Sequence, residues 1–437
     1  MELTRMLPEV TDVRYTGRIS RVVGLTLESL GPFCRVGDLV EVERPRYGPL
    51  VAEVVGFKDR HAVLMPLGSA EGVAPGSTVV SRRRPLEAPV GKALLGRVLD
   101  GLGRPVDGKG PVPIEAGYPV ERQAPDPLRR PRITQAISVG VRAIDGLLTC
   151  GKGQRIGIFA GSGVGKSTLL GMMARGTSAD VVVVALVGER GREVRDFIER
   201  DLTSGLERSV VVAATSDQPA MVRLKAAFVA TSIAEFFRDQ GLDVLLMMDS
   251  LTRFSYAQRE IGLAAGEPPT TRGYPPSVFA MLPRLLERAG TSDRGSITGF
   301  YTVLVDGDDL NEPIADASRA ILDGHIVLTR QLAERQHYPA IDVLASVSRL
   351  MPEVADLQHQ QAAAAIRRLM ATYRDVEDLV HIGAYVRGTN PAADRAIDAR
   401  DAIDRFLQQG VFEKAEFKGS VEALKELSRR FEGPGAS

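Results

Sequence analysis

Hydrophobic and polar positions divide the chain into three zones with different periods. Up to about residue 88, short apolar runs such as 39–43, 50–57 and 62–66 alternate with glycine- and proline-rich turns. Beyond it, strand-like apolar runs alternate with helix-compatible segments, and from about residue 352 the pattern is helical, as in 360–373, 392–408 and 421–431. These patterns predict a small β-barrel, then βαβ units with a parallel sheet, then a helical region.

A glycine-rich segment at 160–167 carries the clearest chemical signal in the chain. It follows an apolar run at 155–159, precedes a helix-compatible run at 168–174, and reads Ala-Gly-Ser-Gly-Val-Gly-Lys-Ser. The order strand, loop, helix is that of a phosphate loop, whose backbone N–H groups point at phosphate oxygens. Ala160 stands where the strict pattern has glycine. The expected nucleotide-binding residues are Gly161, Ser162, Gly163, Val164, Gly165, Lys166, Ser167 and Thr168.

The expected fold class is α/β with a phosphate-loop core and a parallel sheet, and this core resembles that of RecA-like proteins. A small N-terminal β-barrel precedes the core and a C-terminal helical domain follows it. We expect the barrel at 1–88, the ATPase domain at 89–351 and the helical domain at 352–437. Within the loop, Lys166 is expected to reach the β- and γ-phosphates and the Ser167 hydroxyl to hold Mg²⁺.

Two carboxylates follow apolar strand-like runs downstream. Asp249 ends the run 245–249, an arrangement that holds Mg²⁺ beside a phosphate loop. Glu189 follows the run 180–187, which we expect to neighbour the phosphate-loop strand at the carboxyl edge of the sheet. From there it could orient the water that attacks the γ-phosphate. The alternative for both is an ordinary carboxylate at the start of a turn or helix.

Three further segments carry a family resemblance that extends over nearly the whole chain. They are Gly-Tyr-Pro-Pro-Ser-Val-Phe at 273–279, Ile-Leu-Asp-Gly-His-Ile-Val-Leu at 321–328 and His-Tyr-Pro-Ala-Ile-Asp-Val-Leu at 337–344. Together with the phosphate loop they resemble the type III export ATPases, a branch of the rotary-type hexameric ATPases. The flagellar members match best. The injectisome members share most of these segments and remain the alternative.

The resemblance implies roles for several residues. Glu189 stands where the family places its catalytic glutamate, and we include the adjacent Arg190 among the catalytic residues with Lys166. Arg349, in Ser-Val-Ser-Arg, matches the family's arginine finger, which reaches a neighbouring subunit's nucleotide and contributes roughly 10³ to 10⁵ in rate. Tyr338 matches an aromatic that packs on adenine, and Phe417 matches a second aromatic wall. Taken alone, both aromatics are also compatible with core packing.

The resemblance also implies the activity and its partners. The expected activity is Mg²⁺-dependent ATP hydrolysis by a homohexameric ring that energises protein export, with ATP and Mg²⁺ as cofactors. The implied partners are a central stalk protein, a stator-like regulator, export chaperone–substrate complexes and a membrane-embedded export gate. The chain would act in the cytoplasm at the inner face of the cytoplasmic membrane.

Two loops and the N-terminus bear on those partners. The loops 266–276 and 307–313, the latter with Asp308, Asp309 and Glu312, match loops that meet the central stalk in rotary relatives. The alternative is a pair of ordinary surface loops. Only residues 1–10 precede the expected barrel, less than in flagellar members, which favours the injectisome alternative and a regulator bound elsewhere.

Composition narrows the alternatives. The 437 residues carry a formal net charge of +0, whereas a Rho-like hexameric nucleic-acid translocase needs attraction to phosphate backbones. The arginine clusters at 82–84 and 129–130 lie in proline-containing segments, which we expect to be solvated linkers. We therefore expect no nucleic-acid partner. A translocase, a synthase-type catalytic subunit and a non-hydrolysing regulatory subunit remain as alternatives.

The remaining composition argues against secretion and against a metal cluster. We find no apolar run long enough to span a bilayer and no signal-peptide pattern. Cys34 and Cys150 fit neither disulfide nor metal spacing and are expected to be buried thiols. The five histidines show no paired ligand spacing.

Overall fold

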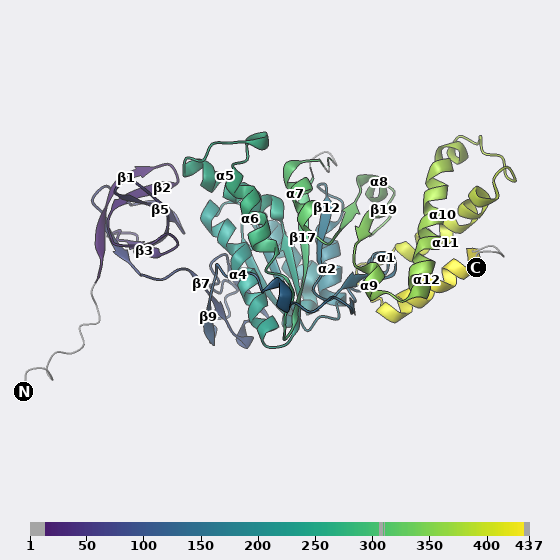
Figure 1. The fold of residues 1–437 in the computed structure, drawn as a ribbon, viewed down its shortest axis with the longest axis horizontal. Coiled ribbons are helices and arrows are strands. Elements are labelled where there is room, and N and C mark those ends of the chain that lie inside the picture. The colour runs from purple at the N-terminus through teal and green to yellow at the C-terminus, as the bar shows by residue number, and fades with distance from the viewer. Residues whose placement is uncertain (1–13, 306–308, 310, 432–437) are drawn as a thin grey trace, which may run out of the picture.

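The computed structural model describes residues 14–305, 309 and 311–431. Three blocks follow one another along the long axis of the molecule: a barrel, a sheet covered by helices, and a group of helices (Figure 1). The predicted order of architectures is therefore confirmed. The exact domain boundaries stay predictions. No helix within the described ranges is long and apolar enough to cross a membrane.

The N-terminal block is a closed barrel with the strand order β1-β2-β5-β4-β3-β6. Its strands are β1 (Thr16–Val23), β2 (Thr26–Leu30), β3 (Leu39–Val42), β4 (Leu50–Lys58), β5 (His61–Pro66) and β6 (Thr78–Ser81). Alternate side chains fill the interior, among them Val40, Val54 and Leu64, none of which is exposed. Closure of the barrel leaves no free strand edge on this block.

The central block is a nine-stranded sheet whose main path runs β19-β18-β12-β17-β15-β13-β14-β8. Its strands are β8 (Arg97–Asp100), β12 (Arg155–Ala160), β13 (Val181–Val187), β14 (Ser209–Ala214), β15 (Asp243–Asp249), β16 (Gly290–Thr291), β17 (Ser296–Leu304), β18 (Gly324–Leu328) and β19 (Ile341–Ser348). β16 and β19 pair antiparallel, and the others pair parallel. Every residue of β13 is buried because helices cover both faces.

One expectation about this sheet is wrong. The strand before Glu189, β13, does not neighbour the phosphate-loop strand β12, since β17 and β15 lie between them. β12 pairs instead with β17 and β18. The expectation fails because chain order does not determine strand order once crossover connections insert later strands between earlier ones.

Helices cover the sheet and form the C-terminal block (Figure 1). They are α1 (Arg142–Leu147), α2 (Lys166–Gly176), α3 (Gly191–Asp196), α4 (Ala220–Asp239), α5 (Leu251–Ala264), α6 (Pro276–Leu286), α7 (Pro313–Ile321), α8 (Arg330–Glu334), α9 (Met351–Val354), α10 (Leu357–His381), α11 (Pro391–Leu407) and α12 (Phe417–Phe431). Short pairs of strands, β7 (Glu87–Val90) with β9 (Ala116–Pro119) and β10 (Ala136–Ile137) with β11 (Cys150–Gly151), lie beside them. Side chains of Asp356 and Asn390 cap α10 and α11, which fixes where these helices begin.

The junction between barrel and core contains a buried cation. Lys225 of α4 is 3% exposed, and its Nζ lies 2.7 Å from Glu53 of the barrel and 3.0 Å from Glu121. Burial raises the pKa of the Glu53 carboxyl, and Lys225 opposes that shift. Because a charge this deeply buried is stable only when paired, the contact ties the barrel to the core.

The arginine clusters expected to be solvated are partly engaged with the core. Arg130 donates to the carbonyl oxygen of Ala289 at 3.1 Å and to that of Glu287, and its side chain is largely buried. Arg82 pairs with Glu41 on the barrel. The expectation is therefore wrong for Arg130, because its guanidinium donates to carbonyls just before β16 and its side chain is largely buried there.

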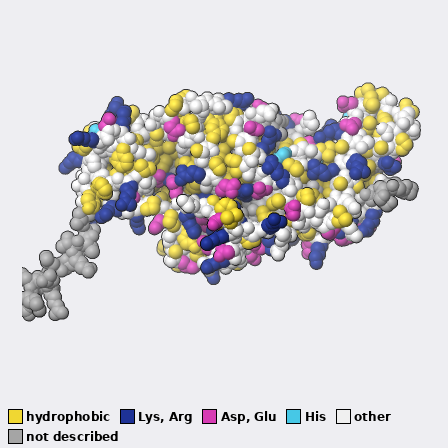
Figure 2. Space-filling view, viewed as in Figure 1, with side chains coloured by type: hydrophobic (Ala, Val, Ile, Leu, Met, Phe, Trp, Pro, Cys, Tyr) yellow, Lys and Arg dark blue, Asp and Glu magenta, His cyan; other side chains and the backbone are white. Residues whose placement is uncertain are grey.

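Large apolar side chains are exposed at both ends of the molecule. They include Leu30 and Phe33 on the barrel, and Ile382 and Val386 between α10 and α11, all more than half exposed. Figure 2 shows hydrophobic surface over the barrel and at the tip of the C-terminal helices. Exposed apolar patches are typical of contact surfaces.

Candidate active site

The glycine-rich loop joins the end of β12 to the start of α2 at the carboxyl edge of the sheet. Gly163 and Gly165 have φ values of +80° and +86°, a region that side chains avoid. Ala160 is the last residue of β12 and is fully buried, so it lies in the strand rather than in the turn. The departure from glycine there therefore leaves the loop geometry intact.

Three side chains from separate elements converge beside this loop. The Nζ atom of Lys166, at the start of α2, lies 2.5 Å from Oδ1 of Asp249 and 3.6 Å from Oε1 of Glu189. Asp249 ends β15, and Glu189 follows β13. Thr302 of β17 donates to the same Asp249 oxygen at 2.7 Å. Glu189 thus reaches the loop although its strand is not adjacent to β12, because Lys166 extends toward it from the helix.

The charges in this cluster shift one another's proton affinity. Burial raises the pKa of Glu189 to about 7, the Asp249 carboxylate adds to the shift, and the Lys166 ammonium opposes it. Burial alone would lower the pKa of Lys166, but the two carboxylates outweigh it and the pKa is raised. Lys166 is therefore a permanent cation at neutral pH, whereas Glu189 can accept a proton there.

The chemistry of the cluster fits a divalent cation held mainly by a nucleotide. Ser167 is exposed beside the loop, and Asp249 supplies a carboxylate, which are hard oxygen donors of the kind Mg²⁺ prefers. Oε1 of Glu189 is buried and has no hydrogen-bond partner among the described residues. No cluster of three or more His, Cys, Asp or Glu forms an all-protein metal cage in the described part of the chain.

Arg253 is a cation of the site that the sequence reasoning missed. It lies in the first turn of α5, where its N–H donates to the capping Ser250 side chain. A Cβ added at Gly188 would lie 2.9 Å from the Cβ of Arg253, and the Arg253 charge lowers the pKa of both Glu189 and Lys166. Its position one turn after the Asp249 strand was the available signal, since helices that follow parallel strands begin at the ligand edge.

Arg190 is placed differently from its catalytic neighbours. It precedes α3, its side chain is 80% exposed, and its Nη1 lies 3.8 Å from Glu193. The structure therefore directs Arg190 toward solvent while it brings Lys166, Glu189 and Asp249 together. The catalytic role of Arg190 stays a prediction.

The two predicted aromatic residues occupy different environments. Tyr338 is 38% exposed beside the loop, and a Cβ added at Gly165 would lie 3.4 Å from its ring. Phe417 begins α12, and its ring lies edge-on to His359 with centroids 6.2 Å apart. Phe417 therefore packs on α10 in this structure, and its role as a nucleotide wall stays a prediction.

A third aromatic lies in the loop that contacts Tyr338. The N–H of Gln409 donates to the Tyr338 carbonyl at 2.9 Å, and Phe412 in the same loop is 70% exposed beneath the Arg175 guanidinium. The segment 406–417 contains three phenylalanines, and its pattern offered no signal that would single out Phe412.

Arg349 lies at the opposite edge of the sheet from the phosphate loop. The last residue of β19, Ser348, pairs with Gly324, the first residue of β18, so Arg349 follows at the amino edge of the parallel strands. It is exposed, and its Nη2 donates to the carbonyl of Arg319 at 3.3 Å. The two edges are about 15 Å apart along the strands. Arg349 therefore faces away from the nucleotide site of its own chain.

The two predicted stalk loops lie against each other where they are described. Arg272 Nη1 is 3.7 Å from Asp309 Oδ2, and the Tyr274 hydroxyl donates to Glu312 at 3.2 Å. Asp308 and the N-terminal segment 1–10 lie outside the described residues. The described residues of both loops lie near α5 and α7 at the carboxyl edge of the sheet (Figure 1).

A phosphate loop after β12, a carboxylate at the end of β15 in the same sheet and the parallel order of these strands define a P-loop ATPase. Comparison with family models agrees, since the nucleotide-binding domain of the ATP synthase alpha/beta family matches residues 140–348 and its beta-barrel domain matches residues 19–83. The "T3SS EscN ATPase C-terminal domain" matches residues 355–426. The chain belongs to the flagellar and type III secretion ATPases, and the predicted family is confirmed.

Individual relatives come from both export systems. The chain is 55% identical to the "Flagellum-specific ATP synthase" of Bacillus subtilis, over 96% of this chain and 97% of the relative. It is 54% identical to the "Type 3 secretion system ATPase" of Xanthomonas euvesicatoria, over 98% and 97%. A solved structure of the assembled ATPase EscN with its central stalk EscO, from an enteropathogenic E. coli type III secretion system, has a TM-score of 0.88 and 48% identity, covering 94% of this chain and 100% of EscN.

Proposed function

We propose that this chain hydrolyses ATP to energise flagellar-type protein export, with each catalytic site shared between two subunits of a homohexameric ring. The observation that carries the proposal is the separation of Arg349 from the Lys166–Glu189–Asp249 cluster. A chain whose arginine faces away from its own nucleotide supplies it to a neighbour. The similarity to the assembled ATPase EscN supports an oligomer.

The residues of one chain would prepare the phosphoryl transfer. Lys166 and the loop N–H groups hold the phosphate oxygens, and Tyr338 packs on the base. Ser167 and Asp249 would hold Mg²⁺, which when bound neutralises charge on the β- and γ-phosphates. Glu189, with its pKa near 7, orients the attacking water and takes up its proton.

The neighbouring chain would complete the site. Its Arg349 stabilises the charge that develops on the transferring phosphoryl group, which contributes roughly 10³ to 10⁵ in rate. This corresponds to about 4 to 7 kcal/mol of transition-state stabilisation that a lone subunit would lack. A single subunit should therefore bind ATP and hydrolyse it slowly.

The proposed partners have less support than the catalytic site. Binding of the loops 266–276 and 307–313 to a central stalk is supported by the position of their described residues at the carboxyl edge and by the EscN–EscO complex. The stator-like regulator, the chaperone–substrate complexes, the export gate and a position at the inner face of the membrane remain proposals from the family. The similarity to a flagellar and to a secretion relative differs by one percentage point, 55% against 54%, so the injectisome system stays the alternative.

Mixing two inactive variants tests the shared site. Arg349→Ala keeps the Lys166–Glu189–Asp249 cluster but has no arginine to offer its neighbour. Glu189→Gln lacks the glutamate that accepts the proton of water but keeps Arg349. A mixed ring contains interfaces in which the first variant supplies the cluster and the second the arginine. We expect the mixture to hydrolyse ATP faster than the sum of the two variants alone, and a merely additive rate would contradict sharing.

A further inference from the structure

Strand β19 contains a bulge just before Arg349. β18 and β19 pair at Val327–Asp342 and pair again at His325–Val347. Between these pairs β18 advances two residues and β19 advances five, so residues 343–346 are looped out. We call residues 342–347 the β19 bulge. A bulge re-aims the residues that follow it, and Arg349 follows this one by two positions.

Polar groups within the bulge fix its conformation. Oδ1 of Asp342 accepts the N–H groups of Leu344 and Ala345, each at 3.0 Å. The Ser346 hydroxyl donates to the Asp342 carbonyl at 2.6 Å and accepts the N–H of Val327 at 2.9 Å. Ser346 thereby replaces the backbone acceptor that β18 loses at the bulge, and the looped residues adopt one defined shape.

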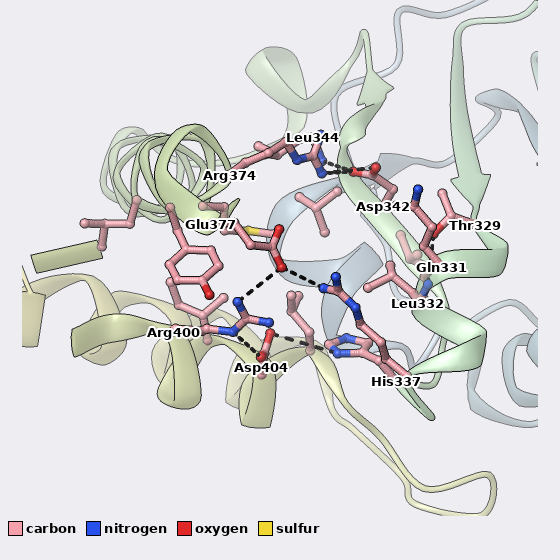
Figure 3. Close-up of a pocket in the computed structure, with 18 of the residues that line it drawn as sticks. Thr329, Gln331, Leu332, His337, Asp342, Leu344, Arg374, Glu377, Arg400 and Asp404 are labelled. Carbon is pink, nitrogen blue, oxygen red and sulfur yellow. Dashed lines mark hydrogen bonds and ion pairs between the residues drawn. The ribbon is translucent and has the colours of Figure 1, made fainter. Parts of the chain in front are cut away.

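Two arginines of the C-terminal helical block hold the bulge from outside. Arg374 Nη2 donates to both carboxylate oxygens of Asp342, at 2.9 and 3.1 Å, as Figure 3 shows. Arg367 donates to the carbonyl of Ser346 at 2.9 Å. The two arginines lie two turns apart on α10 and therefore share one face of the helix.

The packing around these bonds is incomplete. A cavity of about 320 Å³ lies between β19, α10 and α11, lined in part by Leu344, Met370 and Tyr373. The other charges of this cavity are paired among themselves, as Arg335 and Arg400 are with Glu377 (Figure 3). The arginine bonds therefore connect the bulge to α10 beside this cavity, in addition to the apolar core that contains Val343 and Ile366.

The opposite side of the bulge is connected to the phosphate-loop strand. Nε2 of His325 donates to the carbonyl of Ala345 at 3.1 Å, and its ring lies edge-on to Phe159 with centroids 5.9 Å apart. Phe159 stands one residue before the end of β12. The segment from Tyr338 to Arg349 thus runs from the chain's own nucleotide site to the residue that serves the next one.

We propose that Arg374 and Arg367 are positioning residues that hold the β19 bulge in the shape that presents Arg349 to the neighbouring subunit. Neither arginine lies in the Lys166–Glu189–Asp249 cluster, so the proposal has them act on the rate through the position of Arg349. The C-terminal helical block would in this way determine the position of Arg349, in addition to any contact that the block makes with partners. The inference rests on the proposed function of Arg349.

The first arm of the test uses single variants. Arg374→Ala should lower kcat on the order of tenfold to a hundredfold, because a misplacement of about 1 Å costs up to about 10²-fold. The Kd for ATP should be unchanged, and Arg374→Lys should recover part of the rate. Arg387→Ala is the matched control, since it removes an arginine pair with Asp398 at 2.9 Å inside the helical block and away from the bulge. Its kcat should stay within twofold of the parent chain.

The second arm separates positioning from a general structural role. Arg374→Ala is mixed with Glu189→Gln. The ATPase rate of the mixture should exceed the sum of the separate rates, because the intact Lys166–Glu189–Asp249 cluster of the first variant then receives the correctly positioned Arg349 of the second. Rescue of Arg349→Ala by Glu189→Gln without rescue of Arg374→Ala overturns the positioning role and leaves the proposed function intact. No rescue of either variant overturns both, and an unchanged kcat in Arg374→Ala overturns the positioning role. If Arg374→Ala does not assemble, Arg374→Lys is mixed in its place and judged by the same outcomes.

Discussion

At the residue scale, the central feature is a glutamate that titrates near neutral pH. Burial and the Asp249 carboxylate hold the pKa of Glu189 at about 7, in spite of the Lys166 ammonium. A general base is most effective when its pKa lies near the working pH, since it is then largely ionised yet still basic. Glu189 therefore has the proton affinity that its proposed role requires.

The amide variant tests this role. Glu189→Gln should lower kcat about 10²- to 10⁴-fold, because the amide cannot accept the proton of water. ATP binding should persist, since Lys166 and the loop provide the phosphate contacts. Steady-state rates and equilibrium ATP binding measure the two effects, and near-normal turnover with bound ATP would refute the assignment.

The pH dependence of the rate has a definite sign. Glu189 acts as a base only when ionised, and its pKa is raised from its ordinary value to about 7. The rate should therefore rise as pH increases through about 7 and fall on the acid side, where an unperturbed carboxyl would still be ionised. A kcat profile over about three pH units centred on that pKa gives the measurement. A rate that stays constant over the acid half of this range would show an unperturbed carboxyl.

Several of the site residues were predictable one by one. Lys166, Glu189 and Asp249 each follow a recognisable strand, and parallel strands end at one edge of the sheet. Arg253 was missed although it lies in the first turn of the helix that follows the Asp249 strand. Phe412 was not predicted, because its position depends on how the 408–416 loop folds against Tyr338 and Arg175. The roles of Arg349 and Tyr338 came from the family resemblance and not from their local pattern.

At the scale of elements, the phosphate loop depends on glycine at one position for two reasons. Gly165 has φ +86°, and a Cβ there would lie 3.4 Å from the Tyr338 ring. A side chain in the left-handed region costs roughly 1–2 kcal/mol and here would also touch the Tyr338 ring, which the proposed function places on the base. The loop and the base-contacting residue are therefore sensitive to the same substitution.

Gly165→Ala should accordingly weaken ATP binding by about tenfold, the equivalent of 1.4 kcal/mol. Gly419→Ala is the control, since Gly419 lies in α12, has no positive φ and meets nothing within 4 Å. It should stabilise the helix by about 0.5–1 kcal/mol and leave binding unchanged. Equal Kd values for the two variants, measured by calorimetry, would argue against the strained loop.

The elements themselves were largely predictable, but not their pairing. Periodicity indicated the barrel strands, β12, β15 and the C-terminal helices, because each buries one face or lies in a covered sheet. The order of β13 relative to β12 was predicted wrongly. The β19 bulge could not be predicted, since it depends on Arg374, which lies 32 residues away along the chain.

At the scale of the whole molecule, the barrel and the core are joined through Lys225. Its ammonium is buried between Glu53 and Glu121, so removing it leaves the Glu53 carboxylate without its cation in a dry environment. Breaking a buried pair in this way costs about 3–5 kcal/mol, whereas replacing both partners costs less.

Lys225→Met should therefore lower the thermal midpoint markedly, and Lys225→Met with Glu53→Gln should recover part of the loss. Arg195→Ala, which removes an exposed pair with Glu199 at 2.8 Å, is the control and should change stability by less than about 1 kcal/mol. Thermal unfolding followed by circular dichroism gives all three midpoints. Equal midpoints for Lys225→Met and Arg195→Ala would show that the buried contact contributes nothing to the junction.

The most direct test of a shared catalytic site is the specific ATPase activity over a wide range of protein concentration, measured with Mg²⁺ and in the presence and absence of RNA. We expect specific activity to rise steeply as subunits assemble and to be lost in Arg349→Ala at every concentration. Added RNA should leave the activity unchanged. A specific activity that stays constant through the assembly range would contradict the account, because each chain would then complete its own site.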